Sequence, residues 1–142
     1  MDILSRWLHI TASVVAVGGL VYARFVLTPA MQSLAAEQRV LLSEQIAKRL
    51  RPIAVAAIVL VTGSGVYNLI RVMERGVTRD YHIAFGIKFL LALHVLAMLY
   101  IASVPPGGDA ARDAKRSRLL LGGALSGLVV LALGAYLRSL HG

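Results

Sequence analysis

The sequence contains no cysteine and few charged residues, and both shortages narrow the class of protein. Without cysteine the chain has no disulfide bonds, thiolate metal sites, iron–sulfur ligands or cysteine nucleophiles. Only 15% of the 142 residues are charged, against about 25% in ordinary soluble domains. Hydrophobic residues make up 58% of the chain, which excludes a disordered protein and indicates one that lies in a bilayer.

Acidic residues are especially scarce, with seven Asp and Glu against fifteen Lys and Arg and a net charge of +8. None of them lies within a long apolar run, so we do not expect an exporter driven by intramembrane carboxylates. The basic residues lie between the apolar runs, where they would meet anionic headgroups. We therefore expect the lipid bilayer, and no nucleic acid, as a partner. The sequence also lacks a nucleotide-binding loop, an HExxH zinc motif and a serine elbow.

Four apolar runs are long enough to cross a membrane, since a helical span needs roughly 20 apolar residues. Backbone groups in lipid must be satisfied within their own segment, which favours helices over strands. The first run has a weak basic flank and no clean cleavage site, so we expect a retained span rather than a signal peptide. We predict an all-α fold: residues 1–142 form a single transmembrane domain, a four-helix bundle with spans at about 3–27, 52–70, 83–104 and 119–137.

The connection after the first span has a helical pattern of its own. Thr28 and Pro29 suit a helix start, with Thr as the cap and Pro in the first turn. We expect an additional amphipathic helix here that leads into the second span and bends at Pro52. The apolar residues that recur at helical spacing are Met31, Leu34, Leu42, Ile46 and Leu50.

The distribution of basic residues predicts the orientation in the membrane. Five lie on the side of the termini: Arg6, Arg71, Arg75, Arg79 and Arg138. Because Lys and Arg favour the cytoplasmic side, we expect a multi-pass protein of the cytoplasmic membrane with both termini outside. The first and third connections carry nine basic residues: Arg24, Arg39, Lys48, Arg49, Arg51, Arg112, Lys115, Arg116 and Arg118.

Three ionisable residues lie well inside the spans: His9, Lys88 and His94. Ionisable groups in the bilayer are costly and mark candidate sites. The helix face of His9 continues through small residues as far as Gly19, which suits either a tight packing seam with a satisfied histidine or a slot for a flat cofactor. Histidines from facing helices commonly hold haem or metal in bundle cores, so His9 and His94 are the candidate metal ligands.

Lys88 and His94 cannot both point at one small centre, because six residues turn a helix by about 240°. Either could accompany His9 as the second cofactor-binding residue. The alternative for Lys88 is snorkelling to the outer interface, and for His94 a hydrogen bond to a neighbouring helix.

Arg71 is the remaining cofactor-binding candidate, at the outer end of the second span on a face that it shares with Ser64 and Asn68. Its guanidinium suits a haem propionate, and the alternative is an ordinary interfacial arginine. Gly123 and Gly127 form a GxxxG pair, which indicates helix packing or association into a homo-oligomer.

Several stretches resemble the CopD-type copper-resistance membrane proteins. They are Trp7-Leu8-His9 with Gly18-Gly19, Arg49-x-Arg51-Pro52 leading to Thr62-Gly63-x-Gly65-Val66-Tyr67-Asn68, and Phe85-Gly86-Ile87-Lys88. The resemblance covers about the first 100 residues. It implies a four-helix membrane protein and, as one reading, copper transport or resistance without haem. The candidate copper ligands are His9, His82, Met1 and Met73, because imidazole and thioether groups suit copper.

The same residues are similar to the HemJ-type protoporphyrinogen oxidases, a related four-helix group that binds haem b. His9, Gly19-Leu20-x-Tyr22 and Arg24 follow its first span, and Lys88 matches its third-span lysine. The resemblance implies that His9 and Lys88 are associated with haem. The chain departs from that pattern at Ala23-Arg24 and at Gly86, so the oxidase activity is not carried over and no catalytic residue is assigned.

The leading interpretation is a membrane protein that binds haem b or a transition metal through His9 and takes part in electron transfer or redox chemistry. A quinone or other small molecule would be its electron partner. The first alternative is CopD-like copper handling, and the second is a non-catalytic membrane assembly partner.

Overall fold

The computed structural model describes residues 3–74, 76, 79–105 and 110–139, and in these ranges the chain is almost entirely helical. Four helices are long and apolar enough to cross a membrane: Ile3–Gln32, Ala36–Met73, Arg79–Ala102 and Arg112–Leu137. The predicted all-α membrane bundle is therefore confirmed. The elements are α1 (Ile3–Tyr22), the π-helix η1 (Ala23–Leu27), α2 (Thr28–Gln32), α3 (Ala36–Met73), α4 (Arg79–Ala102) and α5 (Ala110–Ser139).

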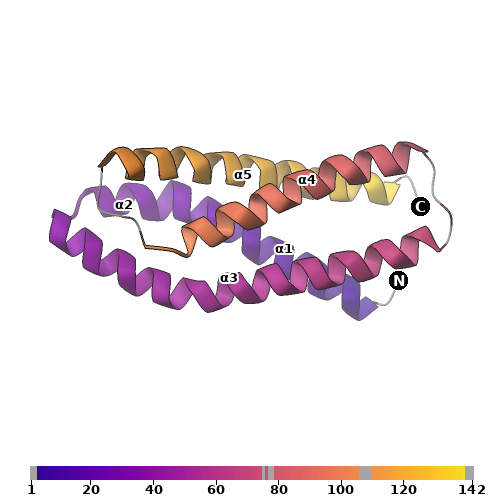
Figure 1. The fold of residues 1–142 in the computed structure, drawn as a ribbon, viewed down its shortest axis with the longest axis horizontal. Helices are drawn as coiled ribbons and strands as arrows, with labels where there is room; N and C mark the ends of the chain where they lie inside the picture. Colours follow the sequence, from indigo (N-terminus) through magenta and orange to yellow (C-terminus); the bar gives the residue numbers. More distant parts are fainter. Residues whose placement is uncertain (1–2, 75, 77–78, 106–109, 140–142) are drawn as a thin grey trace.

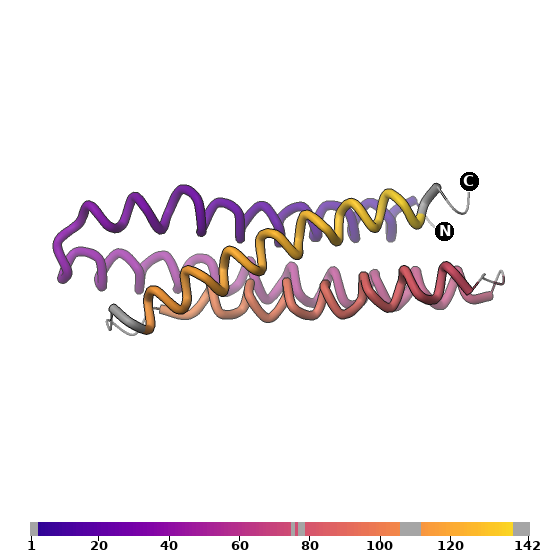
Figure 2. Tube along the Cα trace, turned by 90° about the horizontal axis from the view of Figure 1, so that it is seen from above, coloured from indigo at the N-terminus to yellow at the C-terminus, as the bar shows by residue number. Residues whose placement is uncertain are grey.

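The long helices run up and down, so both chain termini lie at the same end of the bundle (Figure 1). The most extensive contacts join α4 to α5 and α1 to α3. A view at right angles shows the helices as an elongated bundle (Figure 2). We call the end that contains Ile3, Met73, Arg79 and Ser139 the terminal end. The opposite end, which contains η1, α2 and the start of α5, is the basic end.

The apolar core is built mainly from small and branched residues where the helices cross. Leu20 of α1 is fully buried at its centre. Ala54 of α3, Leu99 of α4 and Leu120 of α5 pack around it. These residues lie in the middle of the bundle and toward the basic end, so the core cluster does not reach His9 near the start of α1.

Two glycines of α5 let neighbouring helices approach closely. A Cβ built at Gly123 would lie 2.6 Å from the Cβ of Met98, and one at Gly127 would lie 2.9 Å from the methyl groups of Val17. Both contacts are within the chain. The GxxxG pair therefore packs α5 against α4 and α1.

The additional amphipathic helix is not confirmed as an element of its own, because the segment expected to lead into the second span belongs to the same helix as that span. A short turn after Gln32 leads into one continuous helix, α3, which contains Pro52 in its interior. Figure 1 shows α3 as a bowed but unbroken helix. A proline removes one backbone donor and crowds the preceding turn, which bends a helix without necessarily ending it. At 38 residues α3 is about 57 Å long, more than the roughly 30 Å hydrocarbon layer needs.

The expected helix start at Thr28 is confirmed in part: α2 begins at Thr28 with Pro29 in its first turn, but Thr28 does not cap it. The chain stays helical through η1 into α2, and Leu27 rather than Thr28 is the N-cap position of α2. The Thr28 hydroxyl donates to the carbonyl of Ala23 at 2.7 Å instead of capping the following turn. Pro29 has no N–H for a normal helical bond, and the widened turn before it accommodates the ring without ending the helix.

Candidate functional site

A hydrogen bond joins His9 of α1 to Ser64 of α3, with 2.9 Å between the ring Nδ1 and the serine oxygen. The Ser64 hydroxyl donates to the carbonyl of Leu60, one turn earlier in α3. A hydroxyl has only one proton, so the Ser64 oxygen accepts from the Nδ1–H of His9. The lone pair of the ring is then on Nε2. The backbone carbonyl of Val61 also lies within hydrogen-bonding reach of this ring. With Nδ1 as the donor to Ser64, Nε2 is the nitrogen left for a ligand.

Gly65 makes room for the imidazole beside α3. A Cβ at this position would lie 3.3 Å from Cε1 of His9, closer than nearly all real Cβ contacts. Gly63, two residues earlier, has no atom within 4 Å of its corresponding position. The absence of a side chain at residue 65 is therefore what lets the His9 ring lie against α3 at its present height.

A second polar contact between α1 and α3 lies one turn nearer the terminal end. The Ser5 hydroxyl donates to Oδ1 of Asn68 at 3.0 Å, and Asn68 is buried. Ser5 was not among the predicted site residues. The signal was available, because Ser5 precedes His9 by four residues and such pairs share a helix face.

Lys88 of α4 is half-buried and lies close enough to His9 for an electrostatic interaction between the two side chains. Its amine has no hydrogen-bond or ion-pair partner among the described residues. Gly134 of α5 lies beside this amine, and a Cβ there would be 3.7 Å from Nζ. The structure thus brings together two nitrogen-bearing side chains, from α1 and α4, each opposite a glycine of a neighbouring helix.

His94 lies elsewhere on α4. It is exposed, and its Nε2 is beside Gly122 of α5, 3.6 Å from the position of a Cβ there. It is six residues beyond Lys88, about 9 Å farther along the helix axis. The structure therefore does not bring His94 to His9.

Arg71 lies in the last turn of α3, and its side chain interacts with neighbouring residues of the same segment. Its guanidinium lies 3.4 Å from the carboxylate of Glu74 and 5.8 Å from the ring centre of Tyr67. The pair with Glu74 is about half exposed, which makes it weak. Arg71 is thus at the rim of the terminal end rather than beside His9.

The other copper-ligand candidates are spread over the terminal end. His82 is exposed at the start of α4 and makes an edge contact with the ring of Tyr81. Met73 is 54% exposed, and Met1 lies outside the described residues. Across residues 3–74, 76, 79–105 and 110–139 no group of three His, Cys, Asp or Glu side chains is arranged to hold a metal ion.

The residues at the terminal end fit a group that needs one or two nitrogen ligands. His9 presents Nε2 while its other nitrogen is held by Ser64, the arrangement that orients metal-bound imidazoles. Haem iron takes axial ligands of this kind and does not require a cluster of three side chains. Lys88 supplies a second nitrogen from the facing helix.

Comparisons with protein-family models, with curated proteins and with solved structures find no match for this chain. The function must therefore be argued from the chemistry of the terminal end.

Proposed function

We propose that this protein is a membrane haem b protein that takes part in electron transfer, with His9 as the principal iron ligand and Lys88 as the second haem-associated residue. The observation that carries the proposal is the His9–Ser64 hydrogen bond, which leaves Nε2 as the lone-pair nitrogen in a half-buried ring. The resemblance of His9, Tyr22, Arg24 and Lys88 to the HemJ-type pattern points to the same cofactor.

His9 is prepared for coordination before any ligand arrives. The Ser64 hydroxyl has two carbonyl acceptors in its own helix, those of Leu60 and Val61, and a proton given to either leaves the oxygen to accept from the ring. The hydrogen bond then selects the tautomer and holds the ring plane. Because Gly65 adds no side chain, the imidazole can lie against α3 without being pushed out of this position.

Lys88 is favoured over His94 as the partner of His9. A lysine inside a span and without a carboxylate partner is costly, so it suggests an interaction with a bound group. The Lys88 amine and the His9 ring lie within electrostatic range, whereas His94 lies exposed beside α5. Lys88 either donates its amine lone pair or, as a cation, pairs with an acidic edge of the bound group.

A bound haem would supply one-electron redox chemistry. The chain would bind the haem, hold the imidazole and keep water away with its apolar helices. The electron partner would be a quinone or another small molecule from the bilayer.

The test is the absorption spectrum of the purified full chain, before and after dithionite. The proposal predicts a Soret band that shifts on reduction. Lys88→Met should change its position or occupancy, while His94→Ala, a change in the same helix, should leave both intact. The matched pair separates the two candidates for the second residue.

Two results would oppose the proposal. Stoichiometric bound copper without a Soret band would favour the copper alternative. A folded protein, shown by its helical circular dichroism, that takes up neither haem nor metal would favour the non-catalytic assembly partner.

A further inference from the structure

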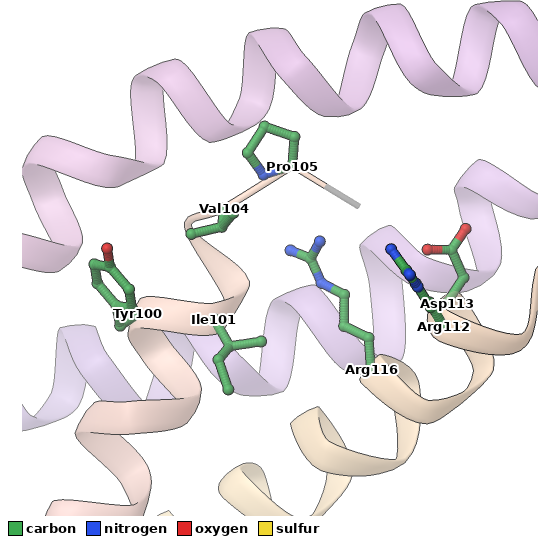
Figure 3. A pocket seen from close by; sticks show the side chains of 7 residues that line it. All are labelled: Tyr100, Ile101, Val104, Pro105, Arg112, Asp113 and Arg116. Carbon is green, nitrogen blue, oxygen red and sulfur yellow. The ribbon is translucent and has the colours of Figure 1, made fainter. Parts of the chain in front are cut away.

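The basic end of the bundle has a hollow of its own, with a volume of about 280 Å³ (Figure 3). It lies between the end of α4 and the start of α5 and is distant from the His9 site. Its lining combines charged and apolar side chains, namely Tyr100, Ile101, Val104, Pro105, Arg112, Asp113 and Arg116.

Arg116 points from α5 into this hollow (Figure 3). One of its terminal nitrogens donates to the carbonyl of Ala102 at the end of α4, at 2.9 Å. A guanidinium has five N–H donors, so this bond holds the side chain in place and leaves donors for another acceptor. The half-buried guanidinium is thus fixed rather than free in solvent.

Two arginines and one aspartate are among the described residues that line the hollow. Arg112 and Arg116 are positively charged, and Asp113 is negatively charged and interacts with Arg116. Arginine groups bind phosphate oxygens through paired N–H donors. The guanidinium groups of Arg112 and Arg116 are therefore suited to the negatively charged oxygens of a phosphodiester.

The opposite side of the hollow is apolar. Ile101, Val104 and Pro105 form it, and the ring of Tyr100 lies beside them. The candidate span in α4 ends at Ala102, and the charged stretch 112–118 precedes the apolar run of α5, so the hollow lies at the level of the headgroups. Inorganic phosphate has no group to place against such a wall, whereas a phospholipid has its glycerol and acyl chains.

We propose that this hollow is a binding site for the headgroup of an anionic phospholipid. The phosphodiester lies against the guanidinium groups of Arg112 and Arg116, and the acyl chains continue along the exposed apolar side chains of α4 and α5. These include Leu93, Tyr100 and Leu125. Basic pockets between transmembrane helices at the cytoplasmic side bind headgroups in this way. This inference does not depend on the cofactor at the terminal end.

The experiment titrates the detergent-purified full chain with short-chain phosphatidylglycerol and counts bound lipids by native mass spectrometry. Arg112→Gln, which leaves the bond between Arg116 and Ala102 in place, should weaken binding roughly fivefold. The double variant with Arg116→Gln should weaken it roughly 30-fold. Phosphatidylcholine should bind much more weakly than phosphatidylglycerol to the unaltered protein.

Arg118→Gln is the matched control, since this exposed arginine of the same helix does not line the hollow. It should change the affinity by less than twofold. Equal losses in the Arg112 and Arg118 variants would show unspecific attraction by the basic end and overturn the site. So would equal binding of phosphatidylcholine, unchanged affinity in Arg112→Gln, or complete competition by inorganic phosphate at the concentration of the lipid.

Discussion

At the scale of single residues, the orientation of one imidazole is set by a serine that was itself oriented by its own helix. Ser64 donates to a carbonyl of its own helix, that of Leu60 or Val61, and its oxygen then accepts from His9. This order of donors and acceptors determines which nitrogen of His9 is available. A substitution at Ser64 should therefore change haem binding without altering His9 itself.

Ser64→Ala removes the acceptor for Nδ1–H, and we expect it to weaken haem binding roughly 10- to 100-fold, as is typical for outer-shell partners of a ligand. Thr62→Val is the matched control, because it removes an exposed hydroxyl from the same helix. Haem titration followed at the Soret band measures both. Equal affinities for the two variants would mean that Ser64 does not orient the ring.

Gly65→Ala tests the space beside the ring. The added methyl would lie 3.3 Å from Cε1 of His9, so the imidazole must shift by a few tenths of an ångström and its bond to Ser64 lengthens. We expect a clear loss of haem occupancy. Gly63→Ala meets no atom within 4 Å and should keep full occupancy, with a gain of about 0.5–1 kcal/mol from better helix propensity.

The sequence singled out His9, Lys88 and His94, because ionisable residues stand out in apolar runs. It left Lys88 and His94 as alternatives, since the direction of each side chain depends on how α4 is rotated against its neighbours. The roles of Ser64 and Gly65 could not be derived either. They depend on contacts across 55 positions of the chain, as in the hydrogen bond between residues 9 and 64.

At the scale of elements, the helix pattern was predictable and the helix boundaries were less so. Length and hydropathy identified all four spans, because the bilayer sets both. Helix boundaries were predicted next to Pro52 and Pro29, but the chain is helical on both sides of each proline. A proline prevents one backbone bond, but a long helix that packs along its length can bend at Pro52 or widen before Pro29 and continue.

Packing between elements gives a prediction at Gly127. A methyl group there would lie 2.9 Å from Val17 of α1, and helix backbones must separate to accommodate it. We expect Gly127→Ala to destabilise the protein by about 1–3 kcal/mol, the usual cost of overpacking. Gly18→Ala, which meets no atom within 4 Å, is the control in α1. Thermal unfolding in detergent measures the difference, and similar melting temperatures would argue against this packing.

At the scale of the whole molecule, the two ends differ in chemistry. The basic end carries the basic residues of η1, the first turns of α3 and the first turns of α5. The terminal end has polar side chains such as Ser64 and Asn68 between α1 and α3, and α1 begins and α5 ends there (Figure 1). Positive charge favours the cytoplasmic side, so we propose that the terminal end faces outward.

The proposed orientation predicts that protease added from outside reaches tags at both termini in cells stripped of their outer layers but with an intact cytoplasmic membrane. Replacing Lys48, Arg49 and Arg51 by Gln should reduce the fraction of chains with this orientation, because it reduces the charge difference between the two sides. Protection of both tags in the unaltered protein would show the opposite orientation.

The most direct test of the central claim is haem binding by His9→Ala, compared with His82→Ala as a second histidine at the same end. The account predicts that His9→Ala loses the Soret band while its helical circular dichroism persists, and that His82→Ala binds haem like the unaltered protein. Full haem occupancy in His9→Ala would contradict the account.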